Sequence, residues 1–137
     1  MALKTAEILT EDEGVSKWVY FCPAKQLTVG VGRNIQQIPF SQDEIDLMLK
    51  NDIARVEQEL TKTFSWFSEL AGARRDAFVC IAFNLGLPRL LRFKKALKSM
   101  SLNNWSEASH HFKDSKWYGQ VTNRAERYCQ MIKTNKY

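Results

Sequence analysis

Three side chains near the N-terminus have the types and spacing that acid–base or nucleophilic chemistry needs. Glu13 supplies a carboxyl, Cys22 a thiol and Thr28 a hydroxyl, at intervals of nine and six residues. A carboxyl can protonate a leaving group, and a thiol can attack an electrophilic carbon or orient a water molecule. A hydroxyl can hydrogen-bond to either reacting group. Together the three residues outline a candidate active site.

The segments around these residues predict the elements that position them. Residues 3–13 are expected to form a helix that ends at Gly14, because glycine accepts the left-handed backbone that terminates helices. Residues 18–32 are rich in Val, Tyr, Phe, Trp and Thr, which predicts two or three short strands interrupted at 23–25. We therefore expect the carboxyl at a helix end and the other two groups on a small strand unit.

The remaining chain predicts helices. Residues 41–44 form a capping box that should begin a long helix reaching Leu60. Residues 73–85 are apolar nearly all round, which is typical of a central buried helix. Further amphipathic helices are expected at 88–99, 105–113 and 123–134.

These elements predict an α+β fold that is mostly helical, with a small β-hairpin or three-strand unit packed on a helical bundle. We expect a single domain over 1–137, with a β subregion at about 15–35 and a helical bundle at about 41–137. Sites favour junctions between substructures, so the cleft is expected between the strand unit and the bundle.

Cysteine usage and hydropathy bear on the compartment. The chain has three cysteines without zinc-ligand spacing, and we expect free thiols in a reducing environment. Cys80 and Cys129 lie in apolar helical segments, where free cysteine is usually packed. No secretory signal or membrane span is visible, so we expect folding in a cytoplasm and no stable membrane insertion.

Charge is distributed unevenly along the chain. Residues 1–85 carry 9 Lys/Arg against 12 Asp/Glu, a net charge of −3, whereas residues 86–137 carry 11 against 3, a net charge of +8. A basic half can draw a protein toward a nucleic acid, an anionic wall polymer or an anionic outer surface. A solvated basic face without a specific partner explains the charge equally well.

Four motifs in order resemble one known family. The ranges 12–14, 28–32, 82–86 and 115–125 are similar to motifs of the phage-type lysozymes, the endolysins typified by the lysozyme of T-even bacteriophages. The likeness covers nearly the whole chain. It implies a lysozyme-like fold and hydrolysis of the β-1,4 bond between N-acetylmuramic acid and N-acetylglucosamine in peptidoglycan, with no cofactor or metal.

The resemblance also implies roles for the three chemical residues. The family's site contains a Glu, a second residue nine positions later that is usually Asp, and a Thr six positions further on. These positions fall on Glu13, Cys22 and Thr28. Glu13 would act as general acid and Thr28 would support it. Cys22 would either attack directly, which retains the anomeric configuration, or direct a water molecule, which inverts it.

Other residues carry over with less direct roles. Arg124 aligns with a family arginine near the catalytic acid and would orient Glu13. Phe83, Asn34 and His111 fall on positions that the family uses to contact substrate. Asn84 and Gln120 are expected to bind the glycan as hydrogen-bond donors.

The resemblance implies an active muramidase that lyses the host cell for phage release. We expect a monomer that stays in the host cytoplasm until a separate pore-forming protein, a holin, gives it access to the wall. The alternatives are a tail-associated lysozyme that penetrates the wall, an enzyme for chitin-like or de-N-acetylated glycans, and a catalytically silent peptidoglycan-binding module. A nucleic-acid partner rests only on the basic half of the chain and is not expected.

Overall fold

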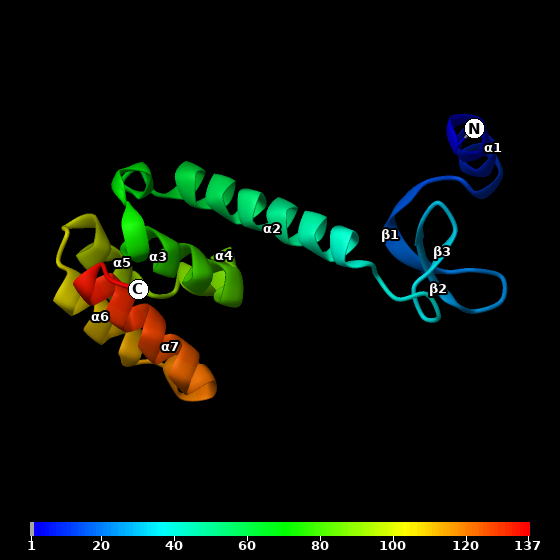
Figure 1. Ribbon diagram of the computed structural model, residues 1–137. Coiled ribbons are helices and arrows are strands. Elements are labelled where there is room, and N and C mark those ends of the chain that lie inside the picture. The colour runs from blue at the N-terminus through cyan, green and yellow to red at the C-terminus, as the bar shows by residue number, and fades with distance from the viewer. Residues whose placement is uncertain (1) are drawn as a thin grey trace. The chain divides into compact units, whose positions relative to one another are not determined.

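The computed structural model describes residues 2–137, which form two compact units, one up to Met48 and one from Leu49 (Figure 1). Within these residues there are seven α-helices and one three-stranded sheet. The predicted α+β, mostly helical fold is confirmed. Among these residues, no helix is both long and apolar enough to cross a membrane.

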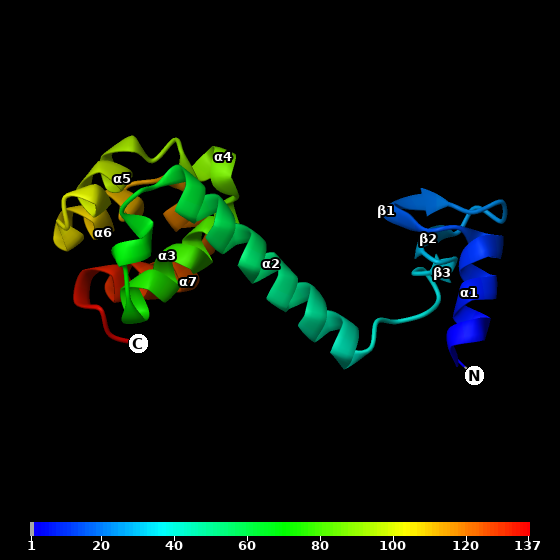
Figure 2. The same ribbon diagram turned by 90° about the horizontal axis from the view of Figure 1, so that it is seen from above.

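The first unit contains one helix and the whole sheet. Its elements are α1 (Ala2–Glu13), β1 (Ser16–Phe21), β2 (Leu27–Gly30) and β3 (Arg33–Asn34). The strands pair antiparallel in the order β1-β2-β3, with Tyr20 and Asn34 on either side of Thr28. Helix α1 lies beside the sheet in both views (Figures 1 and 2). The two or three strands predicted from composition are therefore present, and β1 begins two residues before the predicted segment.

Helix α2 (Gln42–Thr63) starts at the predicted capping box. The backbone N–H of Ser41 donates to Glu44 Oε1 at 2.8 Å, and the backbone N–H of Glu44 donates to Ser41 Oγ at 3.3 Å. These bonds satisfy donors that the first turn of a helix leaves without partners. The helix ends three residues beyond the predicted Leu60, and the boundary between the two units falls within it.

The second unit is helical and is built around α3. Its elements are η1 (Phe67–Glu69), α3 (Gly72–Leu85), α4 (Leu87–Leu90), α5 (Lys94–Ser101), α6 (Trp105–Lys113) and α7 (Lys116–Thr134). On α3, Ala77, Phe78 and Ile81 are fully buried, which confirms the central helix predicted from its apolar composition. Helix α7 packs along α3 and contacts α6, and α6 in turn contacts α5.

The prediction of one continuous helix at 88–99 was wrong. The chain forms α4, leaves the helix at Leu91–Phe93, and begins α5 at Lys94. Phe93 has φ −82° and ψ 57°, outside the helical region. The ring of Phe93 lies 5.5 Å from that of Phe112, and Leu90, which ends α4, is fully buried. The apolar residues on either side of the break are therefore packed in or against the core.

The last helix begins seven residues before the predicted start at 123. Ser115 caps it, with its Oγ accepting a hydrogen bond from the backbone N–H of Tyr118 at 3.2 Å. Val121 has φ −121° and ψ 22°, which kinks the helix. The amphipathic pattern marked only the segment after this kink, because the kink resets the helical phase of the apolar residues.

Candidate active site

Glu13 lies at the C-terminal end of α1, directly against the segment that joins β2 and β3. Gly14 ends the helix with φ +72°, and its N–H donates to the carbonyl of Thr10 at 2.9 Å. A Cβ atom built on Gly32 would lie 2.9 Å from Glu13 Oε2 and 3.0 Å from Cδ. The carboxyl therefore rests on a backbone position that only glycine leaves open, at φ +64°.

Cys22 and Thr28 lie at the hairpin that joins β1 and β2. The N–H of Cys22 donates to the carbonyl of Gln26 at 3.0 Å, and its own carbonyl accepts from the N–H of Lys25 at 2.8 Å. Thr28, on β2, is buried, and its hydroxyl donates to the same Gln26 carbonyl at 2.8 Å. The turn thus brings the predicted thiol and hydroxyl together.

The pKa of the Cys22 thiol is lowered from its ordinary value. A backbone hydrogen bond from Gln26 is the largest cause, burial opposes it, and the backbone of Ala24 and the Thr28 hydroxyl lower the pKa further. Hydrogen bonds of this kind favour the thiolate. The bonds that lower the pKa thus come from the turn itself. The thiolate fraction at neutral pH is raised accordingly.

Asn34 is opposite Thr28 in the sheet, and its side chain shapes the following turn. Its Oδ1 accepts from the backbone N–H of Gln36 at 3.0 Å and of Gln37 at 3.2 Å. The carbonyl oxygen of this side chain is therefore committed to the backbone. The amide nitrogen is the group with which Asn34 would reach a ligand.

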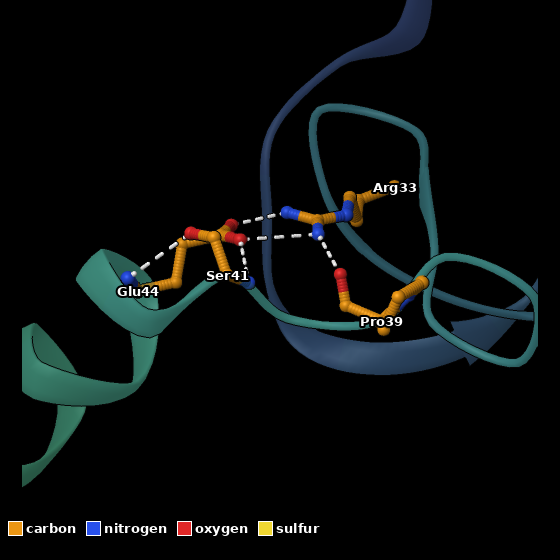
Figure 3. A network of polar contacts seen from close by, with 4 residues as sticks. All are labelled: Arg33, Pro39, Ser41 and Glu44. Carbon is orange, nitrogen blue, oxygen red and sulfur yellow. Dashed lines mark hydrogen bonds and ion pairs between the residues drawn. The ribbon is translucent and has the colours of Figure 1, made fainter.

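A polar network connects β3 to the start of α2 (Figure 3). Arg33 pairs with Glu44 through both terminal nitrogens, and Nη2 also donates to the carbonyl of Pro39 at 2.9 Å. The Arg33 guanidinium is the main cause that lowers the pKa of Glu44 to about 2, and bonds from Ser41 lower it further. These bonds hold the segment between the sheet and the start of α2 in place. Arg33 directly follows Gly32, against which the Glu13 carboxyl lies.

The depressed pKa of Glu44 predicts an acid-dependent stability. Its contribution to folding should be full above about pH 4.5 and should be lost as the pH falls toward about 2, because protonation removes the ion pair. Urea unfolding of the wild type and Glu44→Gln between pH 6 and pH 2 measures this. The difference between their free energies of unfolding should shrink with falling pH. Asp43→Asn, which alters an acid outside the network, should show no such convergence.

Three of the predicted residues on the second unit line one cleft. Phe83 and Asn84 from α3 and Arg124 from α7 border a hollow of about 630 Å³, together with apolar side chains such as Ile53 and Val79. Phe83 is 46% exposed, so its ring is accessible at the surface of the cleft. Asn84 Oδ1 accepts a hydrogen bond from Trp117 Nε1 at 2.7 Å, which fixes the orientation of its amide.

Gln120 and His111 lie elsewhere on the second unit. Gln120 is exposed and immediately precedes the kink at Val121. His111 is on α6, its Nε2 lies 3.6 Å from Glu107, and it borders a second, smaller cleft. The approach of Arg124 to Glu13 and the grouping of all glycan contacts around one site remain predictions.

A second carboxylate network holds α7 across its kink. Tyr118 donates its hydroxyl proton to Glu126 at 2.6 Å, and Lys113 and Gln130 bind the other oxygen at 3.3 and 3.0 Å. The bond from Tyr118 is the largest cause that lowers the pKa of Glu126 to about 2. The turn that carries Gln120 is thereby tied to the buried part of the helix.

Three residues that contact or flank predicted site residues within each unit were not predicted to do so from the sequence. Gly32 was recognised only as part of the motif at 28–32, and its close approach to Glu13 was not predicted. The pairing of Arg33 with Glu44 had no sequence signal beyond the capping box that contains Glu44. Trp117, recognised as part of a motif, turned out to be the partner of Asn84.

One known protein family matches most of the chain. The phage lysozyme family matches residues 10–127, a range that contains all the predicted site residues. The chain is 23% identical to the pre-baseplate central spike protein Gp5 of Enterobacteria phage T4, over 96% of this chain and 28% of that protein.

Two proteins of Dictyostelium discoideum also match. The probable T4-type lysozymes 1 and 2 are 32% and 29% identical over 68 residues, half of this chain and 40% of each relative. The chain thus spans less than half the length of the relatives it matches. Because the family match extends from the end of α1 into α7 and covers both units, the chain belongs to the phage lysozyme family.

Proposed function

We propose that the chain is a lysozyme-type glycoside hydrolase that cleaves the β-1,4 bond between N-acetylmuramic acid and N-acetylglucosamine in bacterial peptidoglycan. The observation that carries the proposal is the placement of Glu13 against Gly32, in the same compact unit as the Cys22–Thr28 pair. These three residues also have the spacing of the site in the matched family.

In this proposal, Glu13 protonates the glycosidic oxygen as the bond to the anomeric carbon breaks. Cys22 then acts in one of two ways. Its thiolate attacks the anomeric carbon and is later displaced by water, or it directs a water molecule that attacks in a single step. Thr28 hydrogen-bonds to the thiolate or the water. Because the Thr28 hydroxyl has a single proton, it would have to release the Gln26 carbonyl before donating to the thiolate or the water.

The second unit would supply glycan contacts. The exposed Phe83 ring offers an apolar surface to a sugar face, and the fixed amide of Asn84 offers its nitrogen as a donor. We assign additional donor roles to the amide nitrogen of Asn34 and to Gln120, a contact to His111, and the orientation of Glu13 to Arg124.

The chemistry of the products tests this function. Purified chain incubated with peptidoglycan should release fragments with reducing N-acetylmuramic acid ends, detected by mass spectrometry after borohydride reduction. Anhydro ends would identify a transglycosylase instead, and binding without cleavage would identify a silent wall-binding module. NMR of the first product formed separates the two roles of Cys22, since retention indicates thiolate attack and inversion indicates a directed water.

For the cellular role, we propose host lysis by a monomeric enzyme that stays in the cytoplasm until a holin opens the way to the wall. A tail-associated role is the second candidate, because one relative is named as a baseplate spike protein. Mass spectrometry of purified virions distinguishes them: a chain found in virions supports the second role, and one found only in the lysate supports the first.

A further inference from the structure

A second cleft, of about 430 Å³, lies on the helical unit where the start of α5 faces the junction of α6 and α7. Its lining residues are Arg92, Phe93, Lys94, Lys95, Ala96, His111, Asp114 and Ser115. Three of these are permanent cations at neutral pH, and Asp114 is the single carboxylate. The excess of positive charge in the second half of the sequence is thus partly concentrated in one hollow.

The cations of this cleft have no polar partner among the residues that the structure describes. Among residues 2–137, Arg92, Lys94 and Lys95 form no ion pair and no side-chain hydrogen bond. Like charges gathered in a concave surface raise the local potential, and an anion is attracted there more strongly than to a flat surface. Lys94 and Lys95 also begin α5, whose dipole adds to the positive potential.

The floor of the cleft is rigid. The ring of Phe93 packs against Phe112 at 5.5 Å and edge-on against Trp117 at 6.3 Å, and Ala96 is 1% exposed. Ser115 is fixed as the cap of α7, because its hydroxyl also donates to the carbonyl of Phe112 at 2.7 Å. The backbone that carries the cations is therefore anchored by packed neighbours, which limits the ordering that a bound group would require.

We propose that this cleft binds the free carboxylates of the peptide stems on the wall glycan, and that it makes the enzyme selective for stems whose carboxylates are not amidated. The proposal rests on the proposed function, which supplies a glycan that carries such peptides. Arg92 offers the planar fork that matches a carboxylate, and Lys94 and Lys95 offer point charges beside it. A cleft this short suits a single small anionic group rather than the long phosphate track of a nucleic acid.

The test compares two substrates. One is native peptidoglycan, and the other is the same material with its stem carboxylates converted to neutral amides. The initial rate of release of reducing ends, at low substrate and low salt, should favour the native wall by about five-fold in the wild type. In Lys94→Gln/Lys95→Gln the ratio of the two rates should fall to about one.

Lys98→Gln provides the matched control, since Lys98 is an exposed lysine on the same helix and does not line the cleft. It should keep the five-fold ratio. Equal rates on both substrates in the wild type, or an equal loss of preference in Lys98→Gln, would overturn the carboxylate site while leaving hydrolysis established. If the wild type cleaves neither wall, the proposed function fails. An NMR chemical-shift titration with a soluble muramyl peptide then tests binding at the cleft independently of hydrolysis. If the residues of the cleft show no chemical-shift changes, the carboxylate site is overturned.

Discussion

Replacing Glu13 by Gln should slow peptidoglycan hydrolysis about 10²- to 10⁴-fold, the range that general acid catalysis supplies. The amide keeps the size of the side chain and its place against Gly32, but it has no acidic proton to donate to the glycosidic oxygen. Release of reducing ends from purified wall measures the rate. Circular dichroism and thermal unfolding establish that the variant is folded.

Two neighbours on α1 make matched controls for this variant. Glu11→Gln and Asp12→Asn remove the same charge from adjacent positions, and both should keep the wild-type rate. A folded Glu13→Gln enzyme that hydrolyses the wall as fast as the wild type would remove Glu13 from the acid role. A Glu13→Gln variant that still sediments with the wall would separate the loss of chemistry from a loss of binding.

The second large effect is expected from Gly32→Ala. Its Cβ would lie 2.9 Å from Glu13 Oε2, so the carboxyl must move to make room. Displacing a catalytic group by about 1 Å can cost about 10²-fold in rate. The left-handed backbone at φ +64° also strains alanine, which should destabilise the fold by roughly 1–2 kcal/mol. Activity at a temperature where the variant is folded isolates the first effect.

Gly30→Ala distinguishes strain from displacement. Gly30 has φ +69°, close to that of Gly32, but a Cβ there would meet nothing within 4 Å. It should therefore lose similar stability while keeping most of the activity. If the two variants lose activity in parallel, backbone strain accounts for both, and the contact between Glu13 and Gly32 has no catalytic importance.

The sequence predicted the fold well where local chemistry decides the structure. The capping box at Ser41 and Glu44 located the start of α2, and glycine located the end of α1, because both signals act within a single turn. The predictions were wrong where packing decides. The break between α4 and α5, where Phe93 packs against Phe112, and the kink at Val121 are local departures from the helix that a periodic pattern does not contain.

The candidate site divides along the same line. The spacing of Glu13, Cys22 and Thr28 could be recognised in the sequence, and the hairpin places the Cys22 thiol beside the Thr28 hydroxyl. The cause of the lowered pKa of Cys22 was not readable, because it arises from backbone groups of a turn whose conformation the sequence does not specify. The orientation of Asn84 likewise depends on Trp117, which is 33 residues away.

Two of the three thiols, Cys22 and Cys129, differ in ways that matter for reactivity toward electrophiles. Cys129 is fully buried, and burial raises its pKa to about 12, so it is almost wholly protonated at physiological pH. Cys22 is half-buried, and its lowered pKa favours the reactive anion. A mild alkylating reagent should therefore modify Cys22 in preference to Cys129. The chain therefore carries a natural attachment point for a spectroscopic label at one of its proposed catalytic residues.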